Sequence, residues 1–191
     1  QKKSKKKIVV KDTLKFLTKA SSILRENLSS KIISITGSCG KTSLKELTGR
    51  SLKKISQTTY SPKSFNNKYG VPISLFNLKK NDEFGIFEIG MDKRGEIDYL
   101  SKIIKPDVGV ITNISYAHIK NFKNINQIAL AKSEIIKNIN DDGYLVLNKD
   151  DKFYNFHKKI ALKRNLKILS FSLKNKSATT YLDSISKVKF K

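Results

Sequence analysis

The chain has very little of several residue types, and each shortage narrows what the protein can be. It contains one cysteine, Cys39, and no tryptophan among its 191 residues. A single cysteine cannot form an internal disulfide, which fits a reducing compartment. The sequence also lacks an apolar run of about 20 residues, the length that crosses a bilayer, and its basic start leads into no apolar signal segment. We therefore expect a cytosolic protein without membrane insertion.

Acidic residues are scarce as well, with 16 Asp and Glu against 39 Lys and Arg, for a net charge of +23. Clustered basic residues are typical of nucleic-acid binding. However, the only arginines are Arg25, Arg50, Arg94 and Arg164, and arginine is the side chain best suited to bidentate phosphate and base recognition. Lysine, asparagine, isoleucine, phenylalanine and tyrosine are abundant together, which indicates an A/T-rich genome. We expect no specific nucleic-acid partner, and we interpret the lysines of residues 2–7 as a solvated linker.

The two ends of the sequence suggest a piece of a longer protein. The chain begins with Gln1 rather than methionine, and the alternating strand pattern Lys187–Lys191 stops without a turn. A chain of this length fits one domain with additions. We expect residues 1–30 to be a linker and helix that follow a missing N-terminal domain. Residues 31–191 are expected to form one domain that is incomplete at its C-terminus.

Predicted strands and helices alternate along the chain, which predicts an α/β fold. Strand cores such as Val108–Ile111 are apolar on both faces, as parallel strands covered by helices must be. We expect a doubly wound, mostly parallel sheet that binds ligands at the carboxyl ends of its strands. The predicted strands are Ile32–Thr36, Thr58–Tyr60, Phe84–Ile89, Val108–Asn113, Tyr144–Asn148 and Lys167–Phe171. The predicted helices are Asp12–Leu28, Thr42–Ile55, Tyr69–Leu78, Glu96–Ile104, Asn126–Ile139 and Lys152–Arg164.

The strongest local motif is Thr-Gly-Ser-Cys-Gly-Lys-Thr-Ser at residues 36–43, between an apolar strand and a helix. Glycines let backbone N–H groups surround a phosphate chain, the helix start adds partial positive charge, Lys41 adds a full charge, and the Thr42 hydroxyl can bind Mg²⁺. The motif departs from the general P-loop because Ile35 occupies the first glycine position. A Gly-rich turn without a ligand is the alternative. The predicted nucleotide-binding residues here are Gly37, Ser38, Cys39, Gly40, Lys41, Thr42 and Ser43.

This shortened loop resembles the ATP loop of the Mur ligase and folylpolyglutamate synthetase superfamily, although Cys39 stands where asparagine is common. Further ordered segments resemble the branch that joins D-alanyl-D-alanine to UDP-N-acetylmuramoyl-tripeptide, and together they cover about residues 31–150. These segments are Ser64–Pro72, Glu88–Met91 with Gly95–Ile97, Thr112–Ile114, Ala117–Ile119 with Phe122, and Ala131–Glu134.

The resemblance implies the central ATP-binding domain of a cytoplasmic, monomeric amide ligase in peptidoglycan precursor synthesis. ATP would phosphorylate a peptide carboxylate, and the amine of D-alanyl-D-alanine would displace phosphate from the acyl phosphate. Lys41 would stabilise the β,γ-phosphates, and Thr42 and Glu88 would hold one Mg²⁺. His118 and a carbamylated Lys132 would hold a second Mg²⁺ and, with Lys41, make up the catalytic set. These residues alone are expected not to ligate, because the substrate domains are missing.

Several of these residues also have an interpretation that needs no resemblance. Glu88 ends an apolar strand, where a carboxylate is unfavourable unless it is paired or binds a cation; a structural ion pair is the alternative to Mg²⁺. His118 follows the next strand and should open onto the same crevice, although a lone loop histidine is more often a packing residue. His157 has no supporting context, and we expect it to be a solvated helix residue.

Lys132 lies within about 40° of the helix face that Ile128, Ile135 and Ile139 define at 100° per residue. A lysine on an apolar face either extends its amine to the surface or has a reason to be buried there. Carbamylation needs the neutral amine, which desolvation and a nearby metal ion would favour.

Three asparagines are candidate ligand contacts. Asn113 could contact the nucleotide, and Asn66 and Asn67 could contact the substrate, with turn capping as the alternative for each. Three other functions stay open: a sister ligase of the superfamily, a basic P-loop ATPase that binds nucleic acid, and a catalytically inactive remnant.

Overall fold

The computed structural model of the chain describes residues 8–116 and 121–184. Within these residues no helix combines the length and the hydropathy that crossing a membrane requires. The strands are β1 (Lys31–Thr36), β2 (Thr58–Tyr60), β3 (Phe84–Glu88), β4 (Val108–Ile111), β5 (Tyr144–Asn148), β6 (Lys167–Ser172) and β7 (Thr180–Tyr181). The helices are α1 (Thr13–Glu26), α2 (Lys41–Leu52), α3 (Gly70–Leu75), α4 (Glu96–Ile104), α5 (Ile125–Lys132), the 3₁₀ helix η2 (Ser133–Asn138) and α6 (Tyr154–Leu162).

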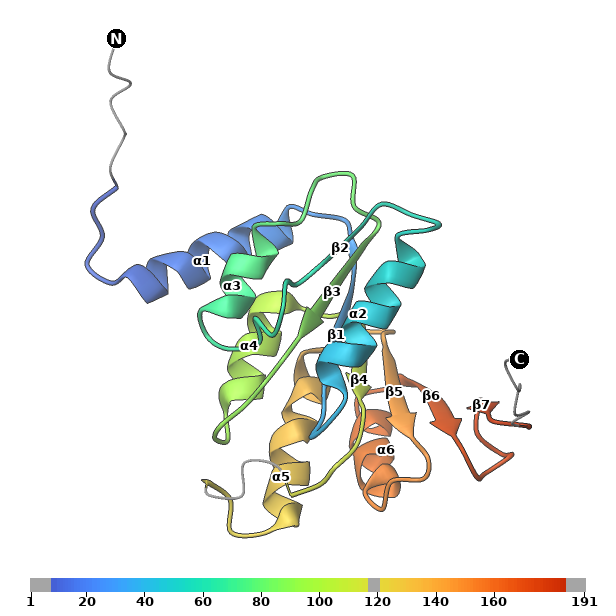
Figure 1. Cartoon of the computed structure of the whole chain (residues 1–191). Helices are drawn as coiled ribbons and strands as arrows, with labels where there is room; N and C mark the ends of the chain where they lie inside the picture. The colour runs from blue at the N-terminus through green and yellow to red at the C-terminus, as the bar shows by residue number, and fades with distance from the viewer. Residues whose placement is uncertain (1–7, 117–120, 185–191) are drawn as a thin grey trace, which may run out of the picture.

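The seven strands form one parallel sheet in the order β2-β3-β1-β4-β5-β6-β7 (Figure 1). The chain starts near the middle of the sheet at β1, adds β3 on one side and then β4 on the other, which is the doubly wound arrangement that the sequence predicted. The register pairs Ile35 of β1 with Glu88 of β3, and Thr36 with Ile111 of β4. The carboxyl ends of these three strands therefore lie together, where ligands bind in such sheets.

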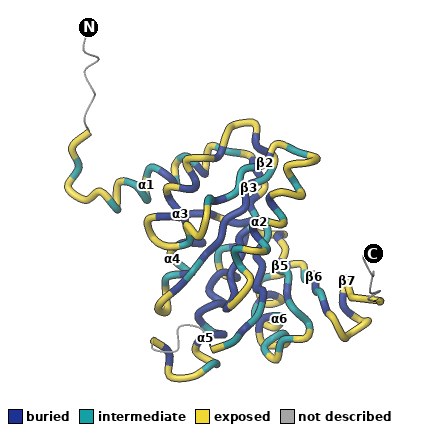
Figure 2. The backbone as a smooth tube through the Cα atoms, viewed as in Figure 1, coloured by how far each residue is buried: buried dark blue, intermediate teal, exposed yellow. Residues whose placement is uncertain are grey.

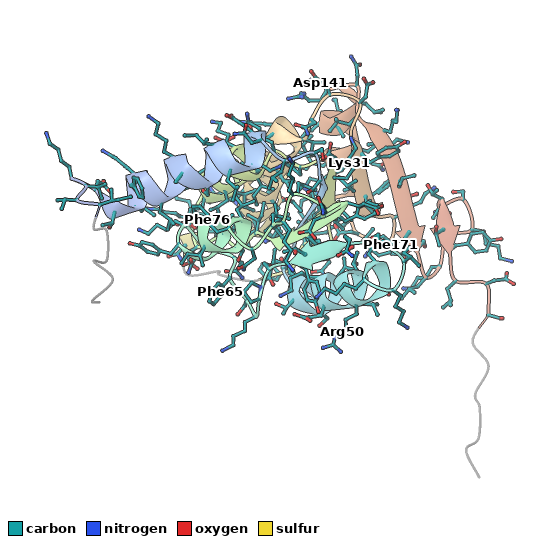
Figure 3. The ribbon with its side chains drawn as sticks, turned by 90° about the horizontal axis from the view of Figure 1, so that it is seen from above. Lys31, Arg50, Phe65, Phe76, Asp141 and Phe171 are labelled. Carbon is teal, nitrogen blue, oxygen red and sulfur yellow. The ribbon has the colours of Figure 1, made fainter. Side chains whose placement is uncertain are left out.

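Two hydrophobic cores cover the two faces of the sheet. The larger core joins Ile32, Phe87 and Ile111 to α4, α5 and η2, and the smaller core packs Ile35, Ile86 and Val110 against α2. Seen from above, α1 and α2 lie on opposite sides of the strands (Figure 3). Strands β1, β3 and β4 run through the buried interior of the molecule, whereas the outer faces of the helices and the short strand β7 are exposed (Figure 2). Strands covered on both faces by apolar contacts explain the near-continuous apolar runs in the sequence.

Most predicted elements are confirmed, with ends that shift by at most three residues, and Thr58–Tyr60, Glu96–Ile104 and Tyr144–Asn148 agree at both ends. The short strand β7 was not predicted. The strand pattern at Lys187–Lys191 lies outside the described residues.

The prediction of one helix over Asn126–Ile139 was wrong, because α5 ends at Lys132 and the chain continues as the 3₁₀ helix η2. Side chains after Lys132 form hydrogen bonds outside the regular α-helical pattern. The Ser133 hydroxyl donates to the Leu130 carbonyl at 2.7 Å, and Asn138 donates to Asp98 and Ser101 of α4. Such bonds compete with the regular α-helical pattern. The predicted apolar face is nevertheless buried through the junction, with Ile128, Ile135 and Ile139 at most 1% exposed.

Candidate nucleotide-binding and catalytic site

The phosphate loop connects β1 to α2 and depends on two glycines with positive φ. Gly40 precedes α2 with φ of 80°, a conformation that a side chain would strain. Gly37 has φ of 145°, and a Cβ there would lie 1.9 Å from the Thr112 Oγ1. The loop can therefore lie directly against the end of β4 only with glycine at position 37. The arrangement leaves the first N–H groups of α2 facing the pocket, as phosphate binding needs.

Hydrogen bonds from the end of β4 hold the loop in this shape. The Ser38 N–H donates to the Asn113 carbonyl at 2.9 Å, and the Cys39 N–H donates to the Asn113 Oδ1 at 3.1 Å. The Cys39 carbonyl accepts from the Thr112 hydroxyl at 2.6 Å and from the Asn113 Nδ2 at 3.2 Å. The Asn113 side chain is thus committed to the loop backbone, which favours the capping interpretation, and its contact with a nucleotide stays a prediction.

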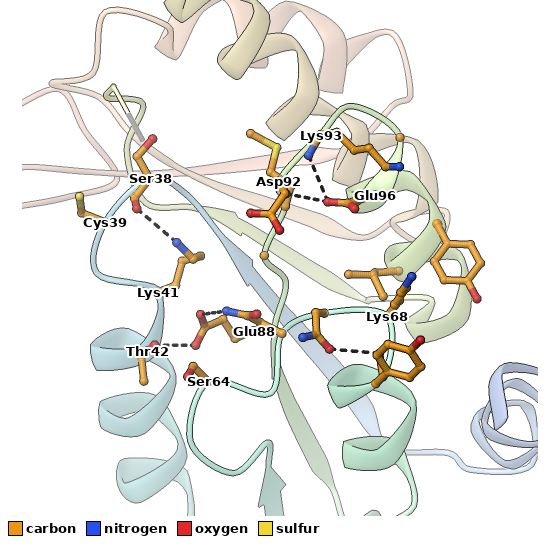
Figure 4. A pocket seen from close by; sticks show the side chains of 18 of the residues that line it. Ser38, Cys39, Lys41, Thr42, Ser64, Lys68, Glu88, Asp92, Lys93 and Glu96 are labelled. Carbon is orange, nitrogen blue, oxygen red and sulfur yellow. Dashed lines mark hydrogen bonds between the residues drawn. The ribbon is translucent and has the colours of Figure 1, made fainter. Parts of the chain in front are cut away.

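Glu88 lies at the carboxyl end of β3 with only 1% of its surface exposed. The Thr42 hydroxyl donates to its Oε2 at 2.7 Å, and the Asn66 Nδ2 donates to its Oε1 at 2.7 Å (Figure 4). Among the described residues no basic side chain forms an ion pair with Glu88. Within the described residues, Glu88 therefore does not form the structural ion pair considered above. A buried carboxylate beside a hydroxyl is an oxygen donor set that suits Mg²⁺.

Two lysines converge on a single backbone carbonyl in the phosphate loop. The Lys41 Nζ donates to the Gly37 carbonyl at 2.8 Å and to the Ser38 carbonyl at 3.2 Å. The Lys132 Nζ, from the end of α5, donates to the same Gly37 carbonyl at 2.9 Å. Lys132 is 2% exposed, so the alternative in which its amine reaches the surface is wrong.

The burial of Lys132 changes its acid–base behaviour. Desolvation, followed by the positive charge of Lys41, lowers the pKa of Lys132 from 10.5 to about 7. Removing an ammonium group from water disfavours its charged form, and a second cation nearby adds to the effect. A substantial fraction of Lys132 is therefore a neutral amine at neutral pH, which is the form that reacts with CO₂.

A pocket of about 1040 Å³ opens beside the phosphate loop. It runs from Ser38–Ser43 past Glu88 to the start of α4 and to the loop before α3 (Figure 4). Asn66 and Asn67 both line it. The Asn67 Oδ1 accepts from the N–H groups of Tyr69 and Gly70, at 3.1 and 2.9 Å, so this side chain caps the start of α3. The substrate contacts predicted for Asn66 and Asn67 stay predictions.

His118, with Ala117 and Ile119, lies outside the described residues. Among the described residues, the structure brings Lys41, Thr42, Glu88 and Lys132 together around the phosphate loop.

The prediction for His157 was wrong. It is 2% exposed rather than solvated, and its Nε2 lies 3.1 Å from the Ala129 carbonyl in α5. It therefore packs beneath the helix that carries Lys132. The burial of Lys45 in α2, which is 0% exposed, was not predicted either. Nor was the role of Glu134, whose carboxylate accepts from the Gly95 and Asp98 N–H groups at the start of α4. Position 157 follows Phe153 by four residues on a helix that faces the core, and this spacing could have indicated its burial.

Burial of His157 predicts a stability loss in mild acid. Desolvation lowers the pKa of His157 below 6.5 despite the Ala129 hydrogen bond. Below pH 6.5 the unfolded chain therefore binds a proton that the folded chain resists, so stability falls as pH drops, by at most about 1.4 kcal/mol per pH unit. We expect urea midpoints of the wild type to decline from pH 6.5 to 5.5 and those of His157→Gln to change less. Equal declines in the two proteins would contradict this cause.

The family model for the Mur ligase middle domain matches residues 35–191. This chain belongs to the Mur ligase family. Among curated relatives, it is 37% identical to the UDP-N-acetylmuramoyl-tripeptide–D-alanyl-D-alanine ligase of Buchnera aphidicola subsp. Baizongia pistaciae, over 94% of this chain. It is 35% identical to the ligase of the same name from Bacillus subtilis, over 75% of this chain. The chain spans 38% of the length of the first relative and 32% of the second.

Solved structures of Mur ligases superpose closely on this Mur ligase domain. MurF from Acinetobacter baumannii matches with a TM-score of 0.86 and 34% identity, over 94% of this chain and 39% of that one. MurF from Thermotoga maritima, in complex with ADP, matches with a TM-score of 0.79 and 29% identity, over 92% of this chain and 40% of that one. Folylpolyglutamate synthetase from L. casei, at 14% identity and a TM-score of 0.63, shares the fold.

Proposed function

We propose that this chain is the ATP-binding middle domain of an amide ligase that joins D-alanyl-D-alanine to UDP-N-acetylmuramoyl-tripeptide. The observation that carries the proposal is the convergence of the phosphate loop, Glu88 and Asn66 on one pocket. It occurs in a chain 37% identical to ligases of that name. The chain spans well under half of the length of those relatives. In this proposal, residues 31–191 supply the nucleotide site of the longer ligase. Residues 1–30 connect this domain to a preceding one, and the sugar-peptide and dipeptide sites lie largely elsewhere.

In the proposed reaction the peptide carboxylate attacks the γ-phosphorus of ATP and ADP leaves. The amine of D-alanyl-D-alanine then attacks the acyl phosphate, forms the amide bond and releases phosphate. Both steps bring anions together, so charge neutralisation and positioning dominate the catalysis. The Lys41 ammonium donates to two loop carbonyls, and a triphosphate would offer it a stronger, charged partner. The backbone N–H groups of Gly40 to Ser43, which line the pocket, would hold the phosphates.

The oxygen donors fit one Mg²⁺ between Thr42 and Glu88. No group of three or more His, Cys, Asp and Glu that could hold a metal ion occurs in residues 8–116 and 121–184. Mg²⁺ commonly binds nucleotides through one or two protein ligands, substrate phosphates and water. When bound, the ion neutralises charge on the β- and γ-phosphates. Asn66 holds the second Glu88 oxygen and so fixes the orientation of the carboxylate.

Replacement of Glu88 by glutamine tests this assignment. Glu88→Gln keeps the size of the side chain and removes its charge, so we expect the magnesium concentration for half-maximal nucleotide binding to rise at least about tenfold, a change of about 1.4 kcal/mol. Titrating Mg²⁺ at fixed ATP in a calorimeter measures this shift. Glu83→Gln, at an exposed position directly before the amino end of the same strand β3, is the matched control. A Glu88→Gln titration that overlays the wild type would remove Glu88 from the metal site.

We further propose that Lys132 is carbamylated and, with His118, holds a second Mg²⁺. The neutral Nζ attacks the carbon of CO₂, forms an N–C bond and releases one proton, which converts the amine into an anionic oxygen ligand. The support in this chain is the burial of Lys132, its pKa of about 7 and its position against the phosphate loop.

The protein is expected to act in the cytoplasm as a monomer, and both properties stay predictions.

Ligation assays test the substrate assignment. We expect the 191-residue chain to bind Mg·ATP weakly and to form no amide product, while the longer ligase forms it with D-alanyl-D-alanine and UDP-N-acetylmuramoyl-tripeptide. Product formation is followed by radiolabelled dipeptide. Glutamate with folate as the acceptor is the control for a sister ligase. Ligation of that pair, or ligation by the 191 residues alone, would contradict the proposal.

A further inference from the structure

Lys45 is the most deeply buried cation among the described residues, with 0% of its surface exposed. It lies on α2, one turn after Thr42. Its ammonium donates to the carbonyl of Lys63 and lies 3.1 Å from the Glu46 Oε1, whose side chain is 30% exposed. Burying an ammonium is costly unless its partners are well placed. The fold therefore keeps a costly group at this position, and nothing in the proposed chemistry has used it.

The carbonyl that Lys45 binds belongs to residues 61–69, which we call the asparagine loop. Lys63 has a positive φ of 46°, which costs energy for a residue with a side chain. Three residues further on, Asn66 donates to Glu88 and its carbonyl accepts from the Gly90 N–H at 2.8 Å. The asparagine loop is thus bonded to α2 through Lys45 and to the end of β3 through Asn66.

The asparagine loop and the residues before it approach three glycines too closely for a side chain to fit there. A Cβ on Gly90 would lie 2.9 Å from the Asn66 Cγ, and a Cβ on Gly70 would lie 2.8 Å from the Phe65 backbone. A Cβ on Gly49 of α2, one turn after Lys45, would lie 2.4 Å from the Tyr60 ring. The Lys45 hydrogen bond to the Lys63 carbonyl holds the loop at this close distance from α2.

We propose that Lys45 is a positioning residue, which holds the asparagine loop against α2 so that Asn66 stays bonded to Glu88. Thr42 and Glu88 come from α2 and β3, and Asn66 comes from the loop between those elements. Lys45 therefore fixes the third member of the group relative to the first. Its buried amine is retained because an apolar side chain at this position would leave the loop carbonyl without this donor.

The first test reads Asn66 directly and needs no nucleotide, so its outcome is independent of the proposed function. In the wild type the Asn66 side-chain N–H donates to a carboxylate, and its amide resonance should be shifted downfield and exchange slowly. We expect Lys45→Met to move this resonance to the position of a solvated asparagine while the backbone resonances of β1 stay in place. Arg50→Met is the matched control, because Arg50 pairs with the same Glu46 but is 74% exposed. An unchanged Asn66 amide in folded Lys45→Met would overturn the proposal.

Lys45→Leu, which also lacks a donor, carries the same expectation and replaces Lys45→Met if that variant does not fold. The second test is a double-mutant cycle on Mg·ATP affinity, which rests on the proposed function. Lys45→Met and Asn66→Ala should each weaken binding about tenfold, and the double variant should be within about twofold of the weaker single variant. Additive losses would show that Lys45 acts independently of Asn66 and would overturn the proposal. Equal affinities in all four proteins would instead count against the nucleotide site, while the Asn66 resonance would still decide the role of Lys45.

Discussion

Lys41→Ala is expected to weaken Mg·ATP binding by at least about 100-fold while leaving the protein folded. The ammonium is the only full positive charge that the phosphate-loop motif itself contributes, and charge-assisted hydrogen bonds are worth about 1.5–3 kcal/mol each. Losing contacts to two phosphates therefore removes about two powers of ten in affinity. Among the described residues the same ammonium donates to two loop carbonyls, at 2.8 and 3.2 Å. Its removal takes away nothing that the core depends on.

Calorimetric titration with Mg·ATP measures the loss, and Lys54→Ala is the control because it removes the same charge from an exposed turn after α2. The variant should also show a second effect at a distance. The charge of Lys41 is the second cause of the low pKa of Lys132, after desolvation. Lys41→Ala should therefore raise the Lys132 pKa above about 7. Wild-type affinity in Lys41→Ala would remove this residue from its assigned role.

The fold could be predicted because each strand and helix carried its own signal. The apolar cores of β1, β3 and β4 predicted a buried parallel sheet, and the Gly-Lys-Thr step fixed where β1 gives way to α2. Once the strands were parallel, their carboxyl ends had to meet, and this placed Thr42 and Glu88 near one another before any distance was known. The close approach of Gly37 to Thr112 occurs at the same carboxyl edge of the sheet. The periodicity of apolar residues could not predict that contact.

The parts that could not be predicted depend on contacts between residues far apart in the sequence. The end of α5 at Lys132 depends on Asn138 and Glu134 bonding to α4, some 40 residues earlier. The burial of His157 depends on α6 packing under α5. Lys45 looked like one of many lysines on a surface helix, although its spacing of four residues before Gly49 placed it on a face that lies close to a neighbour. In a strongly basic sequence such a residue is hard to identify, because the number of lysines does not show which of them is buried.

Lys132→Met is expected to lose activity and gain stability at once. The unfolded chain keeps the Lys132 proton up to a pKa of 10.5, whereas the folded chain gives it up near a pKa of about 7. Between these values the unfolded state binds more protons, so wild-type stability should rise with pH from about 7 to about 10.5. At about 1.4 kcal/mol per pKa unit, this mismatch costs the fold several kcal/mol at neutral pH. Methionine has a similar length and no charge, so it should remove that cost and raise the urea midpoint in CO₂-free buffer.

The same variant should slow turnover of the longer ligase by about three orders of magnitude, since losing a metal ligand gives up several kcal/mol of transition-state stabilisation. ATP affinity should change by less than about threefold, because Lys132 lies behind the loop, where its amine donates to the Gly37 carbonyl. In the wild type, ¹³C-labelled bicarbonate should produce a carbamate resonance that Lys132→Met lacks, and removal of CO₂ should slow the enzyme. A small carboxylate in the buffer should restore part of the rate of Lys132→Ala by occupying the vacated oxygen position. A buried lysine retained only for packing predicts none of the last three effects, and a wild-type protein without the carbamate resonance would refute the assignment.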